Sequence, residues 1–252
     1  MRIHCLGTTG YHPSPTRHTA CYFIPEWQVV LDAGTGFFRL TTLLREQPLP
    51  RLDILLSHAH LDHIIGLTFL LDLMAVTHVK EVRVVGAAEK LEAIERHLFN
   101  EHLFPLRPDL QFVPLEKSHG KVTLDAFELH WFPQQHPGGS LGYLLADPQR
   151  RVAYLTDTIA ESRTLDHSLL RHCDLLLHEC YFPDGQQELA RRTGHSCLRE
   201  VTEVVEQLRP QRTALIHTNP LAEVLGGEIE LTDYHRDQLN MFIPYDQDVI
   251  EI

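Results

Sequence analysis

The segment at residues 57–63, which reads Ser-His-Ala-His-Leu-Asp-His, constrains this chain more than any other part of the sequence. It directly follows a continuous apolar run at residues 52–56, which predicts a short strand covered on both faces. Three imidazoles and one carboxylate therefore stand in a turn at a strand end, where they can point into one cleft. They belong to His58, His60, Asp62 and His63. This donor set, without a thiolate, suits Zn, Mn or Fe.

Apolar runs with helical segments between them extend along the whole chain. Short apolar or β-branched runs predict strands at residues 2–6, 20–24, 28–31, 52–56, 82–85, 112–115, 121–124, 127–132, 141–145, 152–155, 175–177, 213–216 and 249–252. Helical spacing predicts helices at residues 37–46, 64–76, 87–99, 163–171 and 197–208, the last with Ser196 as its N-cap. This order predicts two packed sheets with helices outside, in a single domain over residues 1–252.

Charge and composition narrow the classes of partner and compartment. The formal net charge of −12 argues against a protein that coats nucleic acid along a basic face, although a local positive site could bind a phosphate. The five cysteines are scattered without CxxC spacing, so we expect reduced thiols. No apolar stretch reaches the roughly 20 residues that span a bilayer, so no membrane partner is expected. The N-terminus lacks a signal-peptide layout, which favours the cytoplasm.

One cluster supplies too few ligands for two metal ions, and the chain offers more donors at other strand ends. His136 follows the strand predicted at residues 127–132, Asp157 follows the strand at 152–155, and His217 follows the strand at 213–216. Any one of these residues alone could cap a strand or a turn. Their shared position just beyond an apolar run favours a common site.

Together these residues resemble the ordered ligand set of the metallo-β-lactamase superfamily, and Asp32-Ala33-Gly34 resembles its early strand–turn element. The resemblance covers nearly the whole chain and implies an α/β fold, the four-layer αββα sandwich. It implies His58, His60 and His136 on one metal and Asp62, His63 and His217 on the other. Asp157 would bridge the two ions. Zinc is the default metal, with manganese or iron as alternatives.

Two divalent ions that share one water make hydroxide available at neutral pH, which would serve as the nucleophile. Asp62 is assigned to this catalytic centre as well as to the metal. With two ions, two aspartates and one hydroxide the site keeps a small positive charge inside an acidic protein. That balance favours an anionic substrate.

A second resemblance concerns the reaction. Glu179, at the end of the run at residues 175–177, and the triplet Gly194-His195-Ser196 look like elements of the ribonuclease Z branch and its phosphodiesterase relatives. The branch implies that Glu179 orients His195 and that His195 protonates the departing alkoxide. The branch pattern also suggests substrate-binding residues in the N-terminal loop and after His136. These are Arg17, Ser140 and Tyr143.

The chain departs from the branch in one respect. Members that process transfer RNA carry a long RNA-gripping arm, often between the third histidine element and the bridging aspartate, and the interval between His136 and Asp157 leaves no room for one. We therefore expect hydrolysis of a small or cyclic phosphodiester. Alternatives are a ribonuclease Z-type endoribonuclease for transfer RNA 3′ ends, a lactonase or thioesterase, and a non-catalytic sensor of a metal or phosphate ligand. A homodimer is compatible with the sequence.

Overall fold

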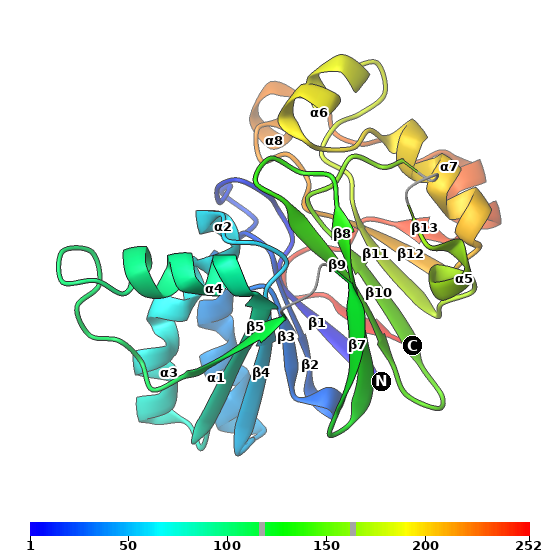
Figure 1. Cartoon of the computed structure of the whole chain (residues 1–252). Coiled ribbons are helices and arrows are strands. Elements are labelled where there is room, and N and C mark those ends of the chain that lie inside the picture. The colour runs from blue at the N-terminus through cyan, green and yellow to red at the C-terminus, as the bar shows by residue number, and fades with distance from the viewer. Residues whose placement is uncertain (116–118, 162–164) are drawn as a thin grey trace. The chain divides into compact units, whose positions relative to one another are not determined.

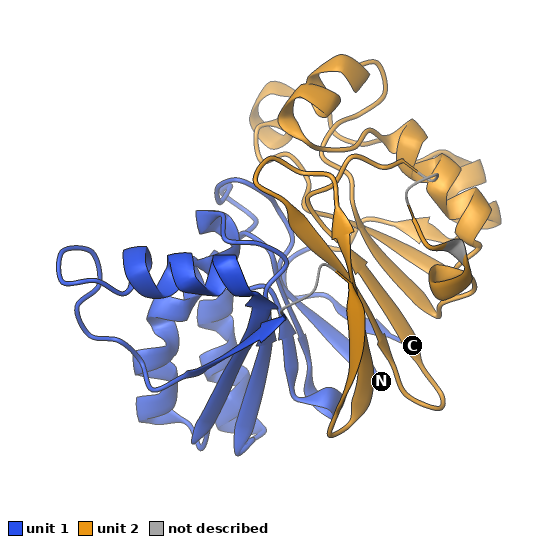
Figure 2. Ribbon diagram, viewed as in Figure 1, with its two compact units in different colours: residues 1–118, 245–251 blue, residues 119–244, 252 orange. Residues whose placement is uncertain are grey.

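The computed structural model describes residues 1–115, 119–161 and 165–252 (Figure 1). The chain divides into two compact units, drawn in two colours in Figure 2. Unit 1 comprises Met1–Ser118 and Tyr245–Glu251, and unit 2 comprises His119–Pro244 with Ile252. Each unit contains a seven-stranded mixed sheet flanked by helices, which confirms the predicted α/β class. The single domain stays a prediction.

The sheet of unit 1 is antiparallel at one end and parallel at the other. Its order is β14 (Val249–Glu251), β1 (Arg2–Gly7), β2 (Cys21–Ile24), β3 (Val29–Leu31), β4 (Arg51–Leu55), β5 (Glu81–Ala87) and β6 (Gln111–Leu115). Pairing is antiparallel from β14 to β3 and parallel from β3 to β6. Every predicted strand of this unit is therefore present, with ends shifted by one or two residues.

Helices pack on one face of this sheet. They are η2 (Thr35–Arg39), α1 (Leu40–Glu46), α2 (Leu61–Ile64), η3 (Ile65–Phe69), α3 (Leu70–Val76), α4 (Ala88–Ala93) and η4 (Ile94–Leu98), whereas η1 (Pro25–Trp27) connects β2 to β3. Leu44 of α1 and Leu73 of α3 share one buried cluster with Leu52 and Ile54 of β4. Alternate residues of β4 and one stripe of each helix thus form a continuous apolar layer.

The prediction of one continuous helix over residues 64–76 is wrong. The segment consists of the end of α2, then η3 and then α3, and Gly66 lies near the start of η3. The Gly66 N–H donates to the Ala33 carbonyl at 2.7 Å and so is withdrawn from the helical ladder. A Cβ on Gly66 would lie 2.6 Å from the Gly34 carbonyl oxygen, so only glycine allows this close approach.

The sheet of unit 2 repeats this pattern in the same order along the chain, with antiparallel strands first and parallel strands after them. It runs β7 (Gly120–Leu124), β8 (Phe127–Gln134), β9 (Ser140–Ala146), β10 (Arg151–Leu155), β11 (Leu175–Glu179), β12 (Arg212–Ile216) and β13 (Met241–Phe242). Pairing is antiparallel from β7 to β10 and parallel from β10 to β13. The short strand β13 has no counterpart in the sequence-based prediction.

The helices of unit 2 are α5 (His167–Leu170), α6 (Gln187–Thr193), α7 (Leu198–Leu208), α8 (Ala222–Leu225) and η6 (Tyr234–Gln238). Val201, Val204, Val205 and Leu208 of α7 recur at helical spacing and are buried with Leu176 of β11. Part of the helix predicted at residues 163–171 lies outside the described residues. Among the described residues, no helix combines the length and apolar character needed to span a bilayer.

The N-cap predicted for α7 is wrong by one residue. Cys197 holds the N-cap position, and Glu200 accepts its backbone N–H at 3.1 Å, which completes one half of a capping box. The Ser196 hydroxyl instead donates to the Thr158 carbonyl at 2.6 Å and accepts the Ala160 N–H at 2.9 Å. Ser196 therefore ties the loop after β10 to the start of α7.

Candidate functional site

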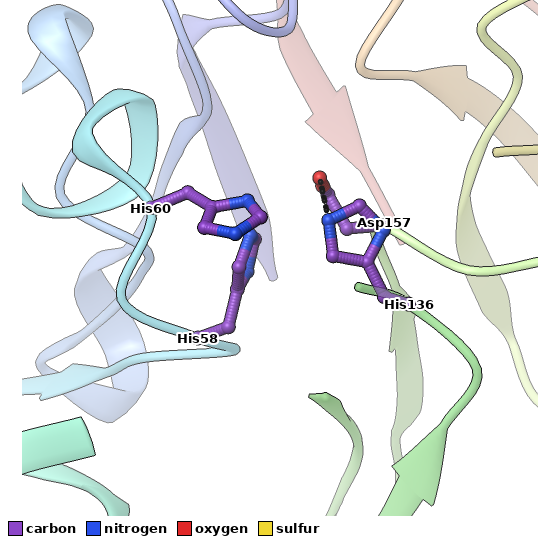
Figure 3. Close-up of side chains that lie close together, drawn as sticks. All are labelled: His58, His60, His136 and Asp157. Carbon is purple, nitrogen blue, oxygen red and sulfur yellow. Dashed lines mark ion pairs between the residues drawn. The ribbon is translucent and has the colours of Figure 1, made fainter. Parts of the chain in front are cut away.

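The cluster predicted from residues 57–63 is formed within unit 1. It follows β4 and runs into α2, and His58 and His63 are buried while His60 is more exposed. The His58 ring centroid lies 4.4 Å from that of His60 and 4.3 Å from that of His63. Figure 3 shows the neighbouring rings of His58 and His60. His63 Nε2 is 3.3 Å from Asp62 Oδ2, so four side chains that could bind a metal lie together at this strand end.

Asp32, which the sequence analysis did not assign to the site, anchors this cluster. It follows β3 and is fully buried, and its carboxylate accepts the Ser57 N–H and hydroxyl at 2.7 Å each. Its Oδ2 also accepts the His63 Nδ1–H at 2.8 Å. The available signal was an aspartate directly after a short apolar strand, the same position that identified the candidate metal ligands.

These hydrogen bonds determine which imidazole nitrogen is left for a metal. Because the Ser57 hydroxyl hydrogen goes to Asp32, the Ser57 oxygen accepts the Nδ1–H of His58 across 3.0 Å. His63 also gives its Nδ1–H away, to Asp32. In both histidines the lone pair then lies on Nε2, and a partner on Nδ1 is the usual arrangement of a metal-binding histidine. The donors of unit 1 thus fit a divalent cation.

We predict that Asp32→Asn weakens zinc binding by about 10- to 100-fold. The amide NH₂ of the variant is a donor and would face one of the hydrogen-bond donors that the carboxylate accepts, so that contact would be lost. Competition with a chromophoric chelator measures the affinity. Asp72→Asn makes the same chemical change at an exposed position of α3 and serves as the control. Equal zinc affinity for Asp32→Asn and the control would show that Asp32 does not orient the ligands.

In unit 2, Asp157 lies between two imidazoles. Its Oδ2 is 3.4 Å from His136 Nε2, the pair joined by the dashed line in Figure 3, and its Oδ1 is 3.1 Å from His217 Nε2. All three side chains are almost completely buried. Because each oxygen of one carboxylate faces a different imidazole, the geometry suits a carboxylate that bridges two cations.

His136 is oriented by a backbone carbonyl. Its Nδ1–H donates to Gly194 O at 2.9 Å, which leaves Nε2 directed at Asp157. Burial lowers the pKa of His136, and the negative charge of Asp157 opposes that shift. The neutral imidazole that binds metals is thereby favoured. Gly194 has a φ of 82°, and a Cβ there would lie 2.2 Å from Pro137 Cδ, so glycine is required beside His136.

Glu179 and His195 form a hydrogen-bonded pair, as the resemblance implies. Glu179 is fully buried at the end of β11, and its Oε1 accepts the His195 Nδ1–H at 3.0 Å. The same oxygen accepts the Thr158 N–H at 2.8 Å, while Oε2 accepts the Ser196 N–H at 3.3 Å. Backbone amides therefore fix the carboxylate, which in turn orients the imidazole. Asp157, His195 and His217 also bring one ligand atom each within 4.8 Å of one another.

Three residues at these strand ends have left-handed backbone conformations. Asp32, Asp157 and His217 have φ values of 55°, 46° and 52°. Such values are uncommon for residues other than glycine and cost free energy unless the surroundings impose them. The strain therefore lies at the turns where the chain leaves β3, β10 and β12 and presents a polar side chain.

The three residues predicted to bind substrate are buried. Arg17 donates to the Thr8 hydroxyl at 2.6 Å, and its guanidinium carbon lies 4.1 Å from the centroid of the Tyr245 ring. Ser140 donates to the Thr156 carbonyl at 3.3 Å. Tyr143, in the middle of β9, is completely inaccessible. Their contact with a substrate stays a prediction.

His178, the neighbour of Glu179, lies on the opposite face of β11 and is fully buried. Its Nδ1–H donates to the Glu179 carbonyl at 2.7 Å. Burial lowers the pKa of His178 below its ordinary value of 6.5, and the bond to Glu179 only partly opposes this. His178 is therefore a neutral structural residue.

The lowered pKa of His178 gives a pH dependence with a defined sign. Below pH 6.5 this residue is protonated in the unfolded chain but stays neutral in the folded chain. Acidification therefore reduces the free energy of unfolding. The loss is at most about 1.4 kcal/mol per pH unit. We expect His178→Gln to lose less stability than wild type between about pH 7.5 and about pH 5.5 in denaturant titrations. The exposed control His97→Gln should follow wild type, and an identical response of His178→Gln would contradict the assignment.

The chain matches a known protein family and several known proteins. The family model described as "Beta-lactamase superfamily domain" matches residues 28–218. The chain is 24% identical to ribonuclease Z of Natronomonas pharaonis, an alignment that covers 100% of this chain and 98% of that protein. The alignment spans 317 positions for a chain of 252 residues, so that relative carries segments that this chain lacks.

Solved structures agree in fold. The short form of human tRNase Z matches with a TM-score of 0.75 at 20% identity and covers 100% of this chain and 99% of that one. A diphosphatase from the PhnP family matches with a TM-score of 0.68 at 18% identity, over 100% of this chain and 97% of that one. At these identities the likeness establishes the fold.

Proposed function

Because the chain belongs to the beta-lactamase superfamily, we propose that its histidines and aspartates bind two divalent metal ions and that it hydrolyses small or cyclic phosphodiesters. Metal-dependent hydrolysis is the activity class of the chain, given its family and its ribonuclease Z relatives. The proposal adds the number of ions, the substrate and the role of each residue. The observation that most supports the proposal is the position of Asp157, whose two carboxylate oxygens each lie beside a different imidazole.

The superfamily resemblance implies that both groups of donors contribute ligands to the proposed pair of ions. We assign His58, His60 and His136 to one ion, and Asp62, His63 and His217 to the other, with Asp157 shared. The donor set suits zinc, with manganese or iron as alternatives. When bound, the two cations would neutralise phosphate charge and make hydroxide available at neutral pH.

The chain's own residues would then act on the leaving group. Glu179 accepts the Nδ1–H of His195 and so directs Nε2 away from the carboxylate. From there His195 would donate a proton to the departing oxygen of the ester. An alkoxide is a poor leaving group, so this proton accelerates phosphodiester cleavage, whereas a thiolate or an activated lactone needs it less. The pair therefore favours phosphodiesters over the lactonase and thioesterase alternatives.

Two features of the chain favour a small substrate over a large RNA. The segments present in the archaeal ribonuclease Z and missing here leave less chain with which to grip a large RNA. The net charge of −12 also opposes a polyanion. Processing of transfer RNA 3′ ends remains the second candidate, because ribonuclease Z relatives align over the whole chain.

A substrate panel tests the proposal. Zinc-loaded protein would be assayed on bis-p-nitrophenyl phosphate, a cyclic nucleotide, precursor transfer RNA, a lactone and a thioester. We expect turnover of the phosphodiesters, with the small ones cleaved more efficiently than the RNA. Faster cleavage of precursor transfer RNA would support the second candidate, and turnover of only the lactone or thioester would refute both. No turnover with metal bound would favour a sensor.

A further inference from the structure

The ring of Tyr181 lies flat against the imidazole of His195. The two ring centroids are 4.5 Å apart and the ring planes differ by 17°. Tyr181 follows β11 by two residues, and only 9% of its surface is exposed. Its backbone N–H donates to the carbonyl of Ser196, next to His195, at 3.1 Å. The backbone thus fixes Tyr181 beside the residue that it stacks on.

The stack adds a constraint that Glu179 does not supply. A hydrogen bond to Nδ1 fixes one atom of the imidazole but leaves the ring able to tilt about that atom. A flat aromatic neighbour fixes the plane of the ring. The ring of His217 is also nearly parallel to that of His195, with planes that differ by 25°, but its centroid is farther away, at 5.5 Å. The rings of His136 and Phe182 meet His195 edge-on, at centroid distances of 5.2 Å and 6.5 Å.

We propose that Tyr181 is a positioning residue that holds the plane of His195, so that Nε2 points at the leaving oxygen. This inference rests on the proposed function, in which His195 donates a proton to that oxygen. Tyr181 acts through His195 and needs no contact with the substrate. Proton transfer is sensitive to such geometry, since a displacement of about 1 Å can cost about 100-fold in rate.

Substrates with different leaving groups distinguish a positioning role of Tyr181 from simple packing. A p-nitrophenolate departs with little protonation, whereas a phenolate gains more from an acid. Loss of His195 alignment should therefore slow methyl phenyl phosphate far more than methyl p-nitrophenyl phosphate. General damage to the fold or to metal binding would slow both esters. Because Tyr181 also lies 5.8 Å from the ring of His217, metal content must be measured in each variant.

The experiment compares zinc-loaded wild type with Tyr181→Leu, which removes the flat ring, and Tyr181→Phe, which keeps it. For Tyr181→Leu we expect kcat to fall by about 10- to 100-fold on methyl phenyl phosphate and by less than about 3-fold on the p-nitrophenyl ester. KM and bound zinc should stay near wild type. Tyr181→Phe should match wild type on both esters.

Equal losses on the two esters, or no loss in Tyr181→Leu, would overturn the proposal. So would a selective loss in Tyr181→Phe, which would remain decisive if Tyr181→Leu failed to fold. NMR of the zinc-loaded protein adds a readout independent of turnover. The His195 ring protons should lose the ring-current shift of Tyr181 in Tyr181→Leu and keep it in Tyr181→Phe. A wild type that cleaves neither ester would refute the proposed function, and the proton-transfer role with it, while the NMR shift would still register the stack.

Discussion

Asp157→Ala is expected to bind at least one metal ion fewer per chain than wild type and to cleave bis-p-nitrophenyl phosphate about 10³-fold more slowly. The two carboxylate oxygens of Asp157 face His136 and His217, so alanine removes the ligand that the two proposed ions would share. It also leaves these two buried imidazoles without the negative charge beside them. Metal analysis by mass spectrometry and the rate at saturating substrate are the measurements.

The matched control is Asp237→Ala, which removes an exposed carboxylate from η6 of the same unit. It should retain the metal content and rate of wild type. If Asp157→Ala did the same, the bridging assignment would be wrong, whatever the function of the remaining histidines.

His195→Ala is expected to lower turnover of methyl phenyl phosphate by about 10²- to 10⁴-fold while the metal content stays unchanged. The reason is chemical, since the variant lacks the proton donor that Glu179 orients. His97→Ala, at an exposed position of η4, controls for loss of a histidine. Steady-state kinetics and metal analysis are made on the same preparation.

The metal measurement decides between two roles for His195. It brings a ligand atom within 4.8 Å of those of Asp157 and His217, a spacing at which it could itself bind a cation. Loss of an ion in His195→Ala would identify a ligand instead of an acid. Wild-type rates on the phenyl ester would exclude both roles.

The sequence predicted the positions of the donors because each follows an apolar run. In a sheet with parallel strands, side chains just beyond the carboxyl ends gather along one edge. Asp157 after β10, Glu179 at the end of β11 and His217 after β12 are three such cases, and the parallel pairing of these strands brings the three together. The strand-end position was the sequence signal for Asp157 and His217, whereas Glu179 was identified by the resemblance to the ribonuclease Z branch.

Other features depend on contacts that no local pattern encodes. The break between α2 and η3 lies beside Gly66, whose N–H bonds to the carbonyl of Ala33, far away in the chain. Ser196 was expected as an N-cap by residue type, but its hydroxyl is engaged by the loop after β10. Asp32 and Tyr181 act on histidines that are distant in sequence, so their partners become visible only in the folded chain.

We propose that seven side chains from the two groups of donors hold a pair of cations. They are His58, His60, Asp62, His63, His136, Asp157 and His217. The most direct measurement is the number of metal ions per chain in protein that has been loaded with zinc and then freed of excess metal. The account predicts about two ions per chain, both removed by a strong chelator together with all phosphodiester turnover. Substantially less than one ion per chain, or turnover that survives removal of the metal, would contradict it.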